Sequence, residues 1–246
     1  GQGGQWPVSA LARLGFRLTL VGAVASVVHV GCAALGPGAE TSPPTVASMT
    51  TAPPTAASPA PTSRGAGLDL CARNQTPCRL RAGEYRPRLF RPPVSFSLGD
   101  GWENLRYYAD AFALGRRLPG GQHAGLSIGT VVEVFEDDER RTVPPGPVGF
   151  LLFLGALEGI KAQPLESVQI GGLSATQVDV ELTGHERLHL FAAREDVFTL
   201  EPGFRSRLIA LEVRGTQLVL VVDAPAASFA PFLPLADGVL ASLRFE

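Results

Sequence analysis

The chain has 246 residues, of which 45% are hydrophobic, and a formal net charge of -2, a composition typical of a globular protein. The near-neutral charge excludes a strongly basic surface, so we expect no nucleic-acid partner. Lys161 is the only lysine among the 21 basic residues, and Ala, Gly and Pro are abundant. This bias is typical of a GC-rich, bacterial genome.

The N-terminus carries the pattern of an export signal. Arg13 and Arg17 precede an apolar run over residues 18–30, and no Lys or Arg follows until Arg64. A positive flank before an apolar core and a neutral exit places the N-terminus in the cytosol and the remainder outside. We therefore predict a signal peptide or anchor over residues 1–35 and a location at the extracytoplasmic face of the cell membrane.

Three fates of this segment are compatible with its sequence. In the first, Gly31-Cys32 ends a lipoprotein signal and Cys32 is lipidated, although His29 stands where such signals usually carry an aliphatic residue. In the second, the apolar stretch continues to Leu35 and remains as a span of about 18 residues, just long enough to cross a membrane. In the third, cleavage near residues 34–36 releases the protein. All three imply export.

Residues 36–67 consist mainly of Pro, Thr, Ala and Ser, with almost no large apolar side chains. Such a segment cannot bury enough surface to offset its ordering entropy, and its prolines keep it extended. We predict a disordered linker between the membrane and a folded body. The composition changes at Leu68, so we predict one extracytoplasmic domain over residues 68–246.

Within this domain the hydrophobic pattern mostly has a period of two, which predicts strands. Two segments have helical patterns, one of them beginning after Pro145 and Pro147. Consecutive antiparallel strands with two helices predict an α+β domain, a single mainly antiparallel sheet with both helices packed on one face. The expected strands cover residues 94–98, 126–134, 178–182, 208–213, 218–222 and 243–245, and the expected helices 148–160 and 228–243.

A family resemblance supports this fold class. It rests on Phe90, Phe96, the sequence LGDGW that ends at Trp102, a central Gly-Gly, and ASLRF over residues 241–245. With these features the chain resembles exported PsbP-like domains, in particular bacterial lipoproteins of that shape. The similarity spans about residues 83–246. In photosynthetic organisms such domains are accessory subunits without chemistry of their own. Only their fold is carried over to this chain.

Cys71 and Cys78 stand at the start of the predicted domain. Outside the cytosol, two cysteines this close in sequence predict a disulfide. Closing so short a loop contributes about 2–3 kcal/mol to stability. The alternative, a metal pair, needs shorter spacing and two further ligands, which no other cysteine supplies.

The sharpest chemical motif is HERLH, which places His185, Glu186 and His189 in the pattern of a zinc peptidase. That chemistry requires a helix, which brings both imidazoles to one face while the glutamate activates the metal-bound water. The flanking alternation instead predicts a strand, on which the two histidines would lie roughly 13 Å apart. The PsbP-like resemblance also favours a strand. We therefore predict surface histidines rather than a metal site.

Three weaker patterns favour structural roles. Ser127 lies in a G-x-S-x-G match, but the strand and helix that a nucleophile elbow needs are not in the required order. The charge run over residues 136–141 lacks the glycine and spacing of a calcium loop and predicts a solvated loop. Trp102, Tyr107 and Tyr108 could form a ligand platform, but a Trp after a turn more often packs at the core rim.

These patterns lead to a prediction of a membrane-tethered extracytoplasmic binding or assembly domain without catalytic activity. The alternative function is a zinc-dependent hydrolase that uses His185, Glu186 and His189. No catalytic residue and no cofactor is predicted, and the ligand, the partner and the oligomeric state stay open.

Overall fold

The computed structural model describes residues 67–246. The predicted signal or anchor segment, the linker and the candidate lipidation site Cys32 lie outside these residues. The predicted domain over residues 68–246 lies entirely within them, together with Gly67, the last residue of the predicted linker.

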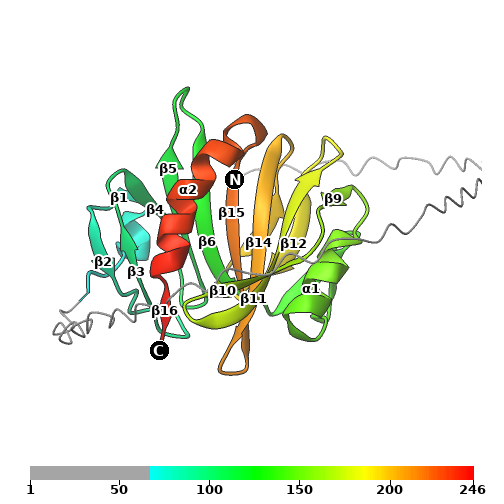
Figure 1. The fold of residues 1–246 in the computed structure, drawn as a ribbon, viewed down its shortest axis with the longest axis horizontal. Coiled ribbons are helices and arrows are strands. Elements are labelled where there is room, and N and C mark those ends of the chain that lie inside the picture. The colour runs from blue at the N-terminus through cyan, green and yellow to red at the C-terminus, as the bar shows by residue number, and fades with distance from the viewer. Residues whose placement is uncertain (1–66) are drawn as a thin grey trace, which may run out of the picture. The chain divides into compact units, whose positions relative to one another are not determined.

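A large antiparallel sheet forms the centre of the fold (Figure 1). Its strands follow the order β1-β4-β5-β6-β15-β14-β11-β10, and β9 pairs with β11 beside β10. They are β1 (Cys78–Arg79), β4 (Trp102–Tyr107), β5 (Ala111–Arg117), β6 (His123–Thr130), β9 (Ile160–Ala162), β10 (Glu166–Ile170), β11 (Leu173–Leu182), β14 (Phe204–Val213) and β15 (Thr216–Pro225).

Two smaller antiparallel sheets accompany the large one. The first has the order β13-β12-β7-β8 and the second the order β16-β3-β2. Their strands are β2 (Gly83–Tyr85), β3 (Val94–Leu98), β7 (Glu133–Glu136), β8 (Glu139–Arg141), β12 (Leu188–Ala192), β13 (Val197–Leu200) and β16 (Arg244–Phe245). The α+β class and the large antiparallel sheet with two helices are as predicted, whereas the two small sheets were not predicted.

The two α-helices, α1 (Gly146–Gly155) and α2 (Ala226–Ser242), pack on opposite faces of the large sheet. Phe229 and Phe232 of α2 join one apolar cluster, which also contains the residues of β3. Phe150 and Leu154 of α1 join the other cluster, together with residues of β12 and β13. The described chain therefore has three layers, and within residues 67–246 no helix is both long and apolar enough to span a membrane.

The prediction that both helices share one face is wrong, and the sequence of β14 shows why. Leu208 and Ala210 face the α1 side, whereas Ile209 and Leu211 face the α2 side, and all four are fully buried. A strand covered on both faces has a nearly continuous apolar sequence, so its period alone does not assign the helices to a face.

Several predicted elements are confirmed and two are corrected. The strand over residues 94–98, the hairpin β14–β15, the helix α2 and the short last strand form close to where the pattern placed them. The helix predicted to reach residue 160 ends at Gly155, because Gly159 turns the chain with φ of 82° and Ile160 already begins β9. The segment predicted as one strand over residues 126–134 divides into β6 and β7.

Candidate functional site

The disulfide expected between Cys71 and Cys78 is present, and it closes the loop that contains the short 3-10 helix η1 (Arg73–Gln75). Arg73 in this loop lies over the ring of Tyr108, with its guanidinium carbon 4.5 Å from the ring centroid, and forms an ion pair of 2.7 Å with Glu195. The disulfide loop is therefore connected to the turn between β12 and β13.

The HERLH motif does not form a helix. His185 and Glu186 lie in an exposed bend after β11, whereas Leu188 and His189 belong to β12. The helical arrangement on which the zinc-peptidase interpretation depends is thus not formed. Among residues 67–246, no group of three or more His, Cys, Asp or Glu side chains is arranged to hold a metal ion.

His189 is instead part of the contact between β12 and the β7–β8 hairpin. Its Nδ1 lies 3.4 Å from Oδ1 of Asp138, and its ring lies 5.4 Å from the ring of Phe135 between centroids. Asp137 and Asp138 form the hairpin turn, both with positive φ, as in a type I′ turn. The charge run predicted as a solvated loop is this hairpin, and its residues are exposed from Glu136 onward.

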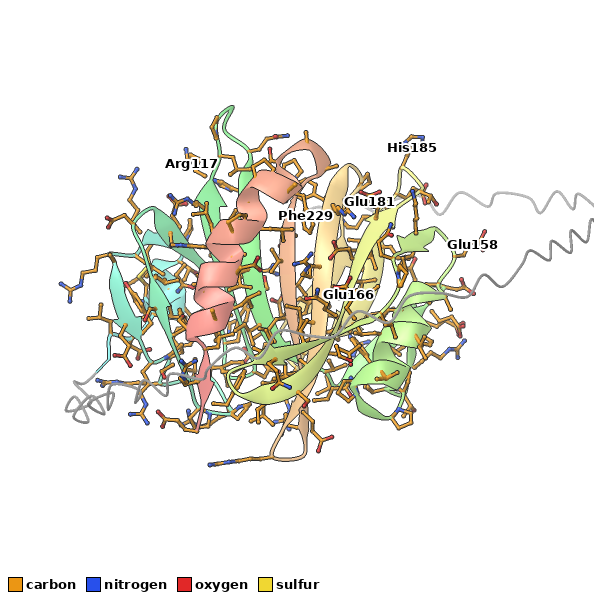
Figure 2. All side chains as sticks on the ribbon, viewed as in Figure 1. Arg117, Glu158, Glu166, Glu181, His185 and Phe229 are labelled. Carbon is orange, nitrogen blue, oxygen red and sulfur yellow. A yellow bond between two sulfur atoms is a disulfide. The ribbon has the colours of Figure 1, made fainter. Side chains whose placement is uncertain are left out.

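A hollow of about 400 Å³, the acidic hollow, opens beside the bend that carries the motif. Its apolar lining comes from four different segments that meet at this end of the sheet, and carboxylates stand at its rim. In Figure 2, His185 and Glu158 extend from two loops at the same side of the molecule. The lining residues are Phe135, Asp137, Asp138, Leu157, Glu158, Gly159, Leu182, Gly184, His185, Glu186, Arg187 and Leu188.

The acidic hollow has more negative than positive charge. Four carboxylates line it, against the guanidinium of Arg187 and the imidazole of His185. Arg187 is already paired at 3.0 Å with Glu201, which does not line the hollow. The hollow can therefore accept a cationic group with an apolar body. The motif and the charge run with Asp137 and Asp138 were recognised in the sequence, but their meeting in one hollow with Glu158 was not, because the three segments are distant along the chain.

Ser127 is not a nucleophile elbow, in agreement with the prediction. It is buried within β6, paired between Ala113 of β5 and Val221 of β15. The chain continues as a strand after it instead of turning into a helix. Ser127 is therefore a buried residue in the interior of the large sheet.

Of the predicted aromatic cluster, Trp102 and Tyr107 are buried, and Tyr108 is partly buried with Arg73 over its ring. Trp102 is buried and its ring lies 5.9 Å from that of Phe232 between centroids, so it packs under α2. The Tyr107 hydroxyl donates to Oδ1 of Asp69 at 2.9 Å and accepts from the N–H of Leu89 at 2.7 Å. Burial, reinforced by the neighbouring Asp69, raises the pKa of Tyr107 to about 12. These contacts favour packing over ligand binding.

A titratable residue without a sequence signal is Asp223 on β15. It lies opposite Gly125 of β6, in a strand flanked by apolar residues. Burial raises the pKa of its carboxyl to about 6, and the positive charge of Arg106 partly opposes this shift. No local pattern marks this residue, because the stretch of β15 directly before it is continuously apolar and buried.

Comparisons with protein families and with curated proteins gave no match. Among solved structures, 17 chains match. They include a protein from Bacteroides thetaiotaomicron (14% identity, TM-score 0.35, covering 62% of this chain and 45% of that chain). They also include the cyanobacterial PsbP of Synechocystis (12% identity, TM-score 0.37, covering 62% of this chain and 86% of that chain). A third is LpqN of Mycobacterium tuberculosis, described as involved in cell envelope biogenesis (16% identity, TM-score 0.34, covering 61% of this chain and 82% of that chain).

The PsbP-like resemblance drawn from the sequence thus recurs among the solved structures. All three TM-scores lie below 0.5 and all three identities below 25%, and the matched region spans less than half of the Bacteroides protein. The functions of these proteins are therefore not transferred to this chain.

Proposed function

We propose that this chain is a membrane-tethered extracytoplasmic domain that binds a ligand or a partner and has no catalytic activity of its own. The proposal rests on one observation: the HERLH motif forms a bend and the start of a strand instead of a helix. The motif residues then stand at the rim of an apolar-floored hollow instead of around a metal ion.

The chemistry of the acidic hollow suits a cationic group. Phe135 and Leu188 supply apolar surface, while Glu158 and Glu186 are exposed and have no ion pair among the described residues. A primary amine or a basic side chain on an apolar body could bury its carbon atoms on this floor and keep its charge beside the carboxylates. Such a group could belong to a small molecule or to a partner protein.

The binding proposal can be tested by photo-cross-linking of the full chain in membranes with a long-chain primary amine that carries a diazirine. We expect cross-links within residues 182–188. Glu158→Gln combined with Glu186→Gln should lower labelling by about two- to thirtyfold, because each exposed carboxylate contributes about 0.2–1 kcal/mol. The matched control is Glu84→Gln with Glu166→Gln, which removes the same charge away from the hollow. Equal labelling of both double variants, or stoichiometric zinc in the purified chain, would contradict the proposal.

The tether is tested separately through Cys32. Export is supported by Arg13 and Arg17 before an apolar run, and lipidation by the single Gly31-Cys32 pair. Under the lipoprotein hypothesis, Cys32→Ser abolishes incorporation of a labelled fatty acid into the full chain, whereas Cys71→Ser leaves it unchanged. Incorporation that survives Cys32→Ser excludes this residue as the acylation site.

A further inference from the structure

A second hollow of about 540 Å³ lies at the end of the sheet where β14 turns into β15, and we call it the arginine hollow. It opens between the segment before β3, the loop between β4 and β5, the connection from β6 to β7, and the turn between β12 and β13. The residues that matter for its chemistry are Arg91, Asp110, Val131, Val132, Arg194 and Arg214.

The walls of the arginine hollow are fixed by backbone hydrogen bonds between these segments. The N–H of Arg91 donates to the carbonyl of Ala109 at 2.8 Å, and that of Thr130 donates to the carbonyl of Asp110 at 2.9 Å. The N–H of Val132 donates to the carbonyl of Ala192 at 2.9 Å. Backbone hydrogen bonds thus join four segments that are distant in sequence, as in a preformed binding site.

The carboxylates of the arginine hollow are already engaged by the protein. The buried Asp110 accepts a short hydrogen bond from the N–H of Arg194 through Oδ2, which fixes the turn between β12 and β13. Glu195 is paired with Arg73 at 2.7 Å. Glu195 is thus paired with a cation, whereas Asp110 has no ion pair among the described residues and its buried Oδ1 accepts no hydrogen bond. Three arginines against that one unpaired carboxylate leave the lining of the hollow with an excess of positive charge.

The arginine side chains, in contrast, have no carboxylate partner. Within residues 67–246, Arg91, Arg194 and Arg214 take part in no ion pair. The Arg91 guanidinium donates to the carbonyls of Arg88 and Phe90, at 2.7 and 2.8 Å, so its position is fixed while its charge stays uncompensated. Three exposed arginines thus line one hollow, and guanidinium groups are the side chains best suited to bind a carboxylate or a phosphate.

The floor of the hollow is apolar. Val131 is partly buried, Val213 is 3% exposed, and Val132 is 40% exposed, which makes it one of the few large apolar side chains left on the surface. Val131 and Val132 lie between the large sheet and the small sheet that contains β12. Their N–H groups donate to the carbonyls of Gln217 and Ala192. The backbone therefore fixes the positions of Val131 and Val132, so a change of side-chain rotamer alone would not bury them.

From this geometry we infer that the arginine hollow binds an amphipathic anion, a single apolar chain with a carboxylate or phosphate head. The chain lies on the valine floor and the head accepts hydrogen bonds from Arg194 and Arg214. The head could belong to a free fatty acid or to a phospholipid, which share this chemistry. The site is independent of the acidic hollow, so either proposal can fail without the other.

The test is photo-cross-linking of the full chain in membranes with two diazirine-bearing probes, a long-chain fatty acid and a single-chain phosphatidic acid. Cross-links should appear in the peptide that contains Val131 and Val132. Arg194→Ala combined with Arg214→Ala should lower labelling about tenfold, equivalent to about 1.4 kcal/mol. Arg194→Lys with Arg214→Lys should retain part of it, because the charge remains.

The matched control is Arg79→Ala with Arg117→Ala, which removes two exposed arginines remote from the hollow (Arg117 is labelled in Figure 2). This control should label as the unchanged chain does. Capture of the fatty acid alone identifies a carboxylate ligand, and capture of the phosphatidic acid alone identifies a lipid headgroup. Equal capture of a matched alcohol probe, or full labelling of the Arg194→Ala, Arg214→Ala variant, overturns the inference.

Discussion

Asp223 is an ionisable side chain on a strand whose neighbours are almost all apolar. It lies opposite Gly125, and a Cβ atom at that glycine would come within 3.1 Å of the carboxylate. The glycine thus leaves room for the carboxylate between the layers. Burial is the main cause of its raised pKa, so the charged form is less stable in the folded protein than in water.

The folded protein therefore holds the Asp223 proton more tightly than the unfolded chain does. Its pKa of about 6 exceeds the ordinary value of 3.8, so the free energy of unfolding should fall as pH rises between about 4 and 6. Asp223→Asn should raise this free energy at pH 8 by on the order of 2 kcal/mol and remove this pH dependence. Urea unfolding at pH 4 and pH 8 measures both effects. A loss of stability in the variant at pH 8 would contradict this assignment.

At the scale of single elements, the G-x-S-x-G match has a packing explanation. Gly125 and Gly129 alternate with Ser127 on one face of β6, and two side chains from elsewhere approach this face closely. Asp223 occupies the space above Gly125, and the ring of Phe198 from β13 occupies the space above Gly129. Gly129 is thus required where the second layer touches the sheet, and Gly125 where the Asp223 side chain of the neighbouring strand β15 lies over β6.

Gly129→Ala tests this close approach. An added Cβ would lie 2.6 Å from Cζ of Phe198, whose ring is stacked on Phe191 with 4.3 Å between centroids. The ring cannot yield without disturbing a buried pair, so we expect a loss of about 1–3 kcal/mol in the free energy of unfolding. Gly99→Ala, where nothing lies within 4 Å, serves as the control and should change stability little. Thermal unfolding of both variants gives the comparison.

Elements with a clear hydrophobic pattern could be predicted from the sequence. The others could not, because they are buried on both faces or depend on contacts with segments far away in the chain. The alternation in residues 94–98 and the apolar stripe of α2 identified both elements. β5 was missed because its first five residues are all buried, which removes the alternation. The acidic and arginine hollows could not be predicted, since each combines side chains from segments far apart in sequence.

At the scale of the whole molecule, the sequence predicted the class but not the layering. Its strands and helices imply an α+β domain, and the structure confirms a large antiparallel sheet with two helices. The opposite placement of α1 and α2 and the two small sheets depend on contacts between strands that are remote in the chain. Local periodicity does not contain this information.

The order of strands in the large sheet also has a consequence for how the chain folds. β6 ends at Thr130 but pairs with β15, which begins at Thr216. In a polypeptide that emerges N-terminus first, from a ribosome or across a membrane, one edge of β6 therefore stays unpaired until the last hairpin follows. Such non-local pairing slows folding and exposes the intermediate to aggregation. Truncation before residue 216 should consequently yield a chain that depends on chaperones instead of a smaller stable domain.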